Sequence, residues 1–157
     1  MKIIIILLFM FSAIPVYSFH NKQLPENDIG TGPSIAYVFT DNSRGYSINY
    51  DTAYTYGYCT ASVNAKYLNM DDIENFGLQS EFTFWFFLNI GGGIGYLGGD
   101  TEGFIYHGFI GFPIGDDDFK HGPFHSYYIE PYYRLNYFNS EFIHEFGIML
   151  KITTYTI

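Results

Sequence analysis

Histidine, serine and carboxylate side chains are the groups in this chain that could perform nucleophilic chemistry, and they come together at two places. One is His125-Ser126 and the other is His144-Glu145. A serine or histidine with an acidic partner could cleave an ester. Both pairs lie in segments that alternate like β-strands, however, and adjacent residues of a strand point to opposite faces. We therefore expect no catalytic residue.

A second candidate site is the acidic run Asp116-Asp117-Asp118-Phe119-Lys120-His121, with His125 four residues further on. Carboxylates suit calcium and imidazoles suit zinc, but this mixed set matches no defined metal loop. We expect a solvated loop with no metal and no cofactor. Acidic loops such as this one and Asp71-Asp72 could instead hold divalent ions that bridge lipopolysaccharide phosphates.

Charged residues elsewhere in the chain fall on one parity of the alternating segments. If the aromatic and aliphatic parity faces lipid, the opposite parity points inward, because a charge facing lipid near the midplane would cost on the order of 2 to 4 kcal/mol. An eight-stranded barrel is just wide enough for side chains to fill its interior. We predict an internal network of salt bridges that fills the lumen, formed by Asp51, Lys66, Glu81, Glu130, Arg134, Glu145 and Lys151.

The stretch from Gly45 to Leu68 shows this alternation most clearly. Tyr and Ile alternate with small or polar residues up to Tyr56, and the apolar set changes phase after Gly57. A period of two indicates strands, and the stretch is too long for one strand of a small domain. It is predicted to be a hairpin that turns near residues 56–58.

The rest of the chain continues the pattern without helical periodicity. A glycine-rich segment, Gly93 to Gly98, has dinucleotide-motif spacing, but no βαβ unit surrounds it, so its glycines are expected to admit large neighbours. The segment from 76 to 97 is too long for one strand, so a turn is expected near 86–89, although no turn-forming residues mark it there. The sequence predicts an all-β, single antiparallel up-and-down barrel of eight strands: 32–40, the two strands of the hairpin, 76–86, 88–97, 104–114, 124–138 and 141–155.

Composition and charge fit a barrel in a membrane. Aromatic residues make up 22% of the 157 residues and charged residues only 15%, as suits a surface that meets lipid. The formal net charge of −9 opposes binding to nucleic acid. Cys59 is the only cysteine, which rules out an intrachain disulfide.

The N-terminus has the features of a secretory signal peptide. Lys2 precedes an apolar core from Ile3 to Ile14, which is short of the ~20 residues of a spanning helix. Cleavage is expected before Phe19, so that residues 1–18 form the leader and residues 19–157 the barrel.

The last strand resembles the terminal assembly signal of outer-membrane β-barrels, with Glu145, Gly147, Leu150 and Ile152 in the motif positions. The chain ends in Thr153 to Ile157 and lacks a terminal Phe. From Gly32 to Tyr155 it resembles small eight-stranded bacterial outer-membrane β-barrel proteins. The resemblance implies that the barrel assembly machinery inserts the protein into the outer membrane of a Gram-negative-type bacterium. It also implies a monomer that is surrounded by lipid and lipopolysaccharide.

The expected function is that of a small non-catalytic outer-membrane barrel with a plugged lumen, which serves envelope structure or surface interaction. Two alternatives stay open: a soluble periplasmic or secreted lipocalin-like barrel that binds a hydrophobic ligand, and a lipid A-modifying hydrolase or acyltransferase. With both termini in the periplasm, the outward loops would be 41–45, 69–75, 98–103 and 139–140. The longer loop 116–123 would then be periplasmic, where short turns are expected.

Overall fold

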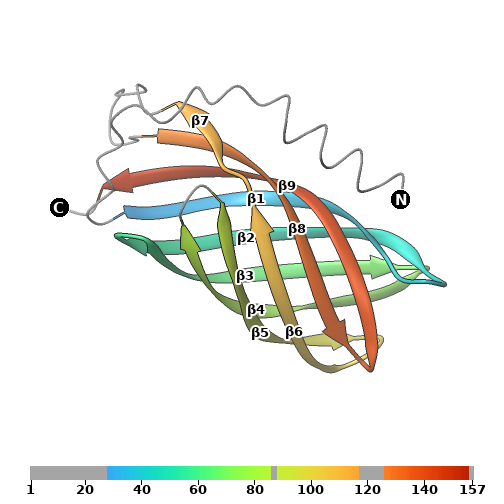
Figure 1. Ribbon diagram of the computed structural model, residues 1–157. Helices are drawn as coiled ribbons and strands as arrows, with labels where there is room; N and C mark the ends of the chain where they lie inside the picture. Colours follow the sequence, from blue (N-terminus) through green and yellow to red (C-terminus); the bar gives the residue numbers. More distant parts are fainter. Residues whose placement is uncertain (1–27, 86–87, 117–125, 156–157) are drawn as a thin grey trace.

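The computed structural model describes residues 28–85, 88–116 and 126–155, and these form one closed, tilted β-barrel (Figure 1). No helix among them is long and apolar enough to cross a membrane. The strands are β1 (Asp28–Phe39), β2 (Arg44–Tyr56), β3 (Cys59–Met70), β4 (Ile73–Trp85), β5 (Asn89–Gly99), β6 (Gly103–Gly111), β7 (Ile114–Asp116), β8 (Ser126–Phe138) and β9 (Glu141–Tyr155). All strand pairs are antiparallel. Consecutive strands pair with each other except β6 and β7, which both pair with β8, and the pairing of β1 with β9 closes the barrel.

The short β7 continues β6, so the wall has eight strands. Gly111 pairs with Tyr132 and Ile114 pairs with Ile129, which keeps one register across the gap. Between them lies Pro113, and Pro131 stands opposite in β8; neither proline has an amide N–H to donate. One bond, from Phe112 N to Pro131 O at 2.9 Å, spans the gap. The strand expected at 104–114 is therefore interrupted at Phe112-Pro113, and the predicted eight-stranded barrel is confirmed.

The register around the wall defines the tilt of the strands. Paired residues can be followed from Ile29 of β1 through β2, β3, β4, β5, β6, β8 and β9 back to Phe39 of β1. The path returns ten residues further along the strand than it began (39 less 29). Eight strands with a stagger of ten tilt by roughly 35 to 45° from the barrel axis.

The hairpin turns at one end are tighter than the sequence suggested. Asp71-Asp72 alone connects β3 to β4, so residues 69–70 and 73–75 are strand. Asn139-Ser140 connects β8 to β9 as expected. All four turn residues have positive φ angles between 47° and 68°, which matches the right-handed twist of a two-residue hairpin. We call this the hairpin end; the ends of the described chain, Asp28 and Tyr155, pair at the opposite, terminus end.

Side chains alternate strictly between the lumen and the outer wall. Along β2, every second residue from Ser47 to Ala53 is buried, and the residues between them are exposed. An apolar cluster fills the lumen at the hairpin end, and a smaller one lies deeper inside. The first, called the end cluster, consists of Val38, Leu68, Met70, Leu97, Ile105, Phe138 and Ile143; the second consists of Ala36, Phe109, Tyr132 and Met149.

A glycine of β5 leaves space for atoms of the neighbouring strands. A Cβ atom added to Gly93 would lie 1.9 Å from the Ser80 carbonyl oxygen and 2.8 Å from Cε1 of His107. The first clash involves backbone and can be relieved only by shifting the strand. Gly98, in the same strand, has no heavy atom within 4 Å of such a Cβ. Gly93 is thus required by the packing of the wall, whereas Gly98 is not.

We expect Gly93→Ala to lower the free energy of unfolding by about 1 to 3 kcal/mol, because added atoms in a packed wall force backbone shifts. Gly98→Ala is the matched control and should leave the unfolding midpoint close to that of the unaltered protein. Urea titration of the refolded protein in detergent measures both. Equal midpoints for the two variants would contradict this packing.

Candidate functional site: the polar lumen

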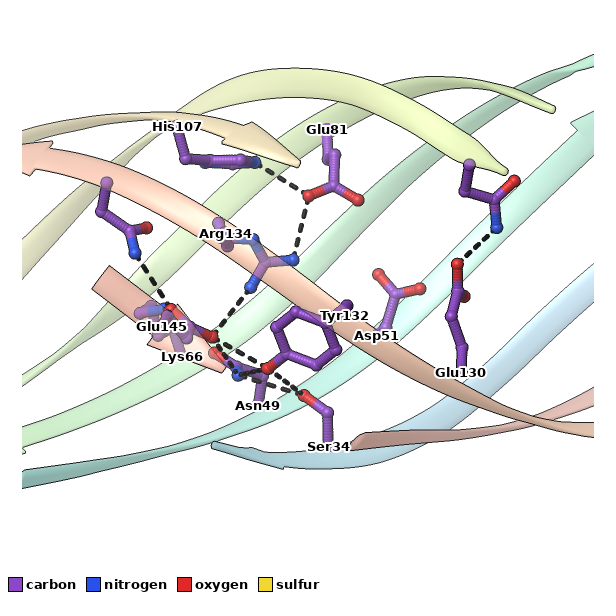
Figure 2. Close-up of polar contacts among 12 residues, drawn as sticks. Ser34, Asn49, Asp51, Lys66, Glu81, His107, Glu130, Tyr132, Arg134 and Glu145 are labelled. Carbon is purple, nitrogen blue, oxygen red and sulfur yellow. Dashed lines mark hydrogen bonds and ion pairs between the residues drawn. The ribbon is translucent and has the colours of Figure 1, made fainter. Parts of the chain in front are cut away.

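Glu145 of β9 is fully buried in the lumen and is the centre of a polar cluster (Figure 2). Lys66 of β3 forms an ion pair with it, and Arg134 Nη1 lies 3.2 Å from its Oε1 atom. Tyr132 OH donates to Oε1 at 2.9 Å. Further donors are the Ser47 hydroxyl at 3.1 Å and the Asn136 amide at 3.1 Å. One carboxylate thus joins side chains from β2, β3, β8 and β9.

Arg134 extends this cluster to the opposite wall. Its Nη2 atom lies 2.9 Å from Oε2 of Glu81 in β4, and His107 Nε2 of β6 lies 2.9 Å from the same oxygen. In Figure 2 the guanidinium lies between Glu81 and Glu145. The rings of Phe109 and Tyr132 pack against it, with centroids 5.2 and 5.1 Å from Cζ. The lumen is therefore bridged by charged groups from side to side.

A second polar group lies nearer the terminus end. Lys151 Nζ is 3.3 Å from Oδ2 of Asp51, and it lies 5.9 Å from the ring centroid of Tyr128. Glu130 accepts a hydrogen bond from the Asn89 amide at 2.5 Å. Glu130 is 1% exposed, so its carboxyl group lies inside the barrel, and it forms no direct salt bridge with the described residues.

The buried charges nearly balance. Glu81 and Glu145 face Lys66 and Arg134 in the first cluster, and Asp51 faces Lys151 in the second. Desolvation of a lone charge costs several kcal/mol, which pairing and additional hydrogen bonds offset. The seven charged residues that the sequence placed on the inward parity are all buried in the lumen. Six of them form ion pairs with one another there.

Sequence reasoning missed three lumen residues that complete these clusters: His107, Tyr132 and Asn89. Tyr132 shares the parity of Glu130 and Arg134 on β8. His107 and Asn89 lie on strands without Asp, Glu, Lys or Arg, and they fall on the parity opposite to the outward Tyr106 and Ile90, which is the signal that could have found them. Tyr132 lies among other aromatic residues, so its residue type did not distinguish it. Because it points inward, its hydroxyl donates a hydrogen bond to Glu145.

The His144-Glu145 pair is not assembled into a site. His144 lies on the outer wall, where its Nδ1 atom is 2.8 Å from Tyr133 OH, while adjacent Glu145 points into the lumen. His125 and residues 117–121 lie outside the described residues. Within the part of the chain that the structure describes, no group of three or more His, Cys, Asp or Glu could hold a metal ion.

The residues of the assembly motif alternate along β9. Glu145 and Gly147 face inward, and a Cβ on Gly147 would lie 2.6 Å from the Tyr132 ring, so glycine is needed there for packing. Leu150 is exposed on the outer wall. Recognition of these residues by an assembly machine stays a prediction.

We expect Glu145→Gln to destabilise the barrel by about 3 to 5 kcal/mol, because it leaves buried Lys66 and Arg134 without a shared counter-charge. Glu102→Gln, which removes an exposed carboxylate, is the matched control and should have a small effect. Urea titration in detergent micelles gives both values. The double variant Lys66→Met/Glu145→Gln should recover part of the loss; additive losses would show that the pair is not coupled.

No protein-family model and no curated protein matches the sequence. Among solved structures, the chain is similar to Neisserial surface protein A, at 10% sequence identity and a TM-score of 0.54, over 86% of this chain and all of that one. A de novo designed transmembrane β-barrel has 12% identity and a TM-score of 0.48 over 85% of this chain and all of its own. Ail of Yersinia pestis, solved with the heparin analogue sucrose octasulfate, has 10% identity and a TM-score of 0.41, over 81% and 97%.

Of these likenesses, the one to Neisserial surface protein A bears on the architecture, and its low sequence identity limits it to the fold. It agrees with the closed register of eight antiparallel strands described above. The chain therefore has the fold of the small eight-stranded bacterial outer-membrane β-barrels.

Proposed function

We propose that this protein is a small, non-catalytic outer-membrane barrel with a plugged lumen, which serves envelope structure or surface interaction. The observation that carries the proposal is the polarity of the wall. Exposed large hydrophobic side chains number 29 among the described residues, whereas charged residues such as Glu145 and Arg134 are fully buried. A protein in water has the opposite arrangement, and contiguous apolar surface of this extent needs an apolar partner. A lipid bilayer supplies it.

Part of the outer wall follows the gradation that a bilayer favours, although Tyr50 and Tyr106 are also exposed near the middle of β2 and β6. Aliphatic residues such as Ile48, Val63 and Leu78 occupy the middle of their strands. Aromatic rings pair between neighbouring strands at the hairpin end, where Tyr46 meets Tyr67 and Tyr137 meets Phe142. Such rings prefer the water interface of a membrane.

The height of the apolar band agrees with this assignment. Tyr46 and Tyr56 lie ten residues apart on β2, one towards each end. At about 3.3 Å per residue and a tilt of roughly 40°, this corresponds to about 25 Å along the axis, the height of the apolar band in outer-membrane barrels.

A filled lumen follows from the same geometry. The ion pairs around Glu145 and Glu81 cross the interior, and the end cluster occupies it at the hairpin end. Eight strands leave no space beyond that for an aqueous channel. The proposed role is thus mechanical or interactive and not the passage of solutes.

The two alternatives receive less support. A lipocalin-like barrel would place its aromatic residues inside and its charges in water, opposite to the distribution found. A lipid A-modifying enzyme would need its histidine beside a nucleophile and an acid, and Tyr133 is the polar partner that His144 contacts.

The proposed location is the outer membrane of a Gram-negative-type bacterium. Residues 1–18 would act as the secretory signal peptide, and the barrel assembly machinery would insert the barrel. With the termini in the periplasm, the two-residue turns Asp71-Asp72 and Asn139-Ser140 face outside. Such short turns offer little surface to a protein partner, so lipid and lipopolysaccharide are the proposed neighbours of a monomer.

Unboiled protein from isolated outer membranes should migrate faster on a denaturing gel than boiled protein, because a closed barrel resists detergent. The folded protein in a planar bilayer should show no steady conductance. A soluble protein with identical migration in both samples would overturn the membrane assignment, and stable open channels would overturn the plugged lumen alone.

An arginine scan of the outer wall separates a membrane barrel from a soluble one. Val63→Arg, in the middle of the wall, should reduce folding stability in lipid by about 2 to 4 kcal/mol, while Ile73→Arg, at the rim, should cost about 0 to 1 kcal/mol. Val63 and Ile73 are similarly exposed, at 53% and 44%, so a soluble barrel would tolerate both substitutions equally. Urea titration in lipid vesicles provides the measurement.

A further inference from the structure

The charged side chains inside the lumen leave one negative charge unmatched. Four acids and three bases are buried among the described residues: Asp51, Glu81, Glu130 and Glu145 against Lys66, Arg134 and Lys151. His107 is a poor source of the missing charge. Its Nδ1 atom has no hydrogen-bond partner among the described residues, so a protonated ring would bury an unpaired N–H group. With its acids ionised, the described lumen therefore has a net charge of one negative unit.

Glu130 of β8 is the acid that lacks a base of its own. Its Oε1 atom accepts a hydrogen bond from Asn89 Nδ2 at 2.5 Å, whereas Oε2 is shielded from water and has no partner in the described part of the chain. The charged groups that act on this carboxylate are Lys151, Glu81 and Asp51, which are one base and two acids. Lys151 is already engaged, because its Nζ atom lies 3.3 Å from Asp51 Oδ2. Since an uncompensated buried carboxylate is strongly unfavourable, Glu130 requires a positive partner.

Asp51 of β2 offers a second free oxygen in the lumen. Its Oδ1 atom has no hydrogen-bond partner among the described residues, and the residue is 3% exposed. Figure 2 shows Asp51 and Glu130 apart from the group around Glu145. A proton on Glu130 would serve that carboxylate alone and would leave Asp51 Oδ1 without a donor. A hard cation, which takes several oxygen ligands at once, can serve both acids.

The charge count selects the kind of cation. One positive unit restores the balance, whereas a divalent ion would leave an excess of positive charge close to Lys151. No group of three or more His, Cys, Asp or Glu among the described residues could hold a metal ion, so the ligand sets of zinc or calcium are not formed there. The end cluster fills the lumen at the hairpin end, so an ion would enter from the terminus end.

We propose that the lumen binds one monovalent alkali cation, Na⁺ or K⁺, with Glu130 as the anchoring ligand and Asp51 as the second acid. The ion completes the charge balance of the barrel interior. It also joins β2 to β8, two strands that are not neighbours in the wall. The site lies in the lumen and does not depend on what surrounds the outer wall.

The test is urea unfolding of the full-length refolded protein in detergent above neutral pH. NaCl and choline chloride are mixed at a constant total concentration, so that the ionic strength stays fixed while the Na⁺ concentration varies. One ion bound only by the folded state raises the folding equilibrium constant about tenfold for each tenfold rise in Na⁺ above its dissociation constant. We expect this dependence in the unaltered protein and in Glu102→Gln, which removes an exposed carboxylate. Glu130→Gln, whose amide oxygen can still accept the Asn89 bond, should lose it.

Asp51→Asn provides a second variant with an independent reason for the same loss. Removal of this acid leaves three acids and three bases in the described lumen and frees Lys151 to pair with Glu130. The dependence on Na⁺ should therefore disappear in this variant too. Broadening of the ²³Na NMR signal by the folded unaltered protein, reversed by added K⁺, reports binding without unfolding.

Four results would overturn the proposal. A Na⁺ dependence that survives in Glu130→Gln would reveal a general salt effect or an adventitious ion only. Stability that ignores Na⁺ but falls as the pH rises, and does so only while Glu130 is present, would assign a proton to this carboxylate. Stronger stabilisation by Mg²⁺ or Ca²⁺ than by Na⁺ would assign a divalent ion. A heat-modifiable barrel with no Na⁺ dependence would refute the cation site and leave the proposed function intact.

Discussion

The narrow lumen of an eight-stranded barrel is the constraint on which the rest of this structure depends. Side chains from opposite walls meet inside it, so each inward residue must fit its neighbours and each inward polar group must find a partner there. Glu145 meets this requirement by accepting bonds from side chains of three other strands, β2, β3 and β8, and Arg134 by joining Glu145 to Glu81. Gly93 and Gly147 meet it by leaving room for His107 and Tyr132.

The same constraint explains which features the sequence could predict. A period of two assigns each residue of a strand to one face, so the alternation from Gly45 to Leu68 was enough for β2, β3 and the turn between them. The alternation also assigned Asp51, Lys66 and Arg134 to the inward face of their strands. Charge made these residues visible, because few positions in a lipid-facing wall tolerate it.

Other features depended on register, which alternation does not specify. Lys66 and Glu145 are 79 residues apart and meet only because the stagger of ten brings β3 and β9 to the same depth. Neutral partners such as Tyr132 and Asn89 do not stand out by type. The gap between β6 and β7 could be predicted only from the register, which puts Phe112 and Pro113 opposite Pro131 and Glu130. The two-residue Asp71-Asp72 turn could be predicted only by knowing that both aspartates adopt positive φ angles.

The central claim is that the outer wall contacts lipid while the lumen holds the charges. Spin labels at five outward positions of β3 test it most directly: Cys59, the native cysteine, and single cysteines at Ala61, Val63, Ala65 and Tyr67 in a Cys59→Ala background. In vesicles, collisions with oxygen should be most frequent at Val63, and collisions with a water-soluble nickel complex should be most frequent at Cys59 and Tyr67. Nickel collisions of equal frequency at all five positions would show that water surrounds the wall and would contradict the account.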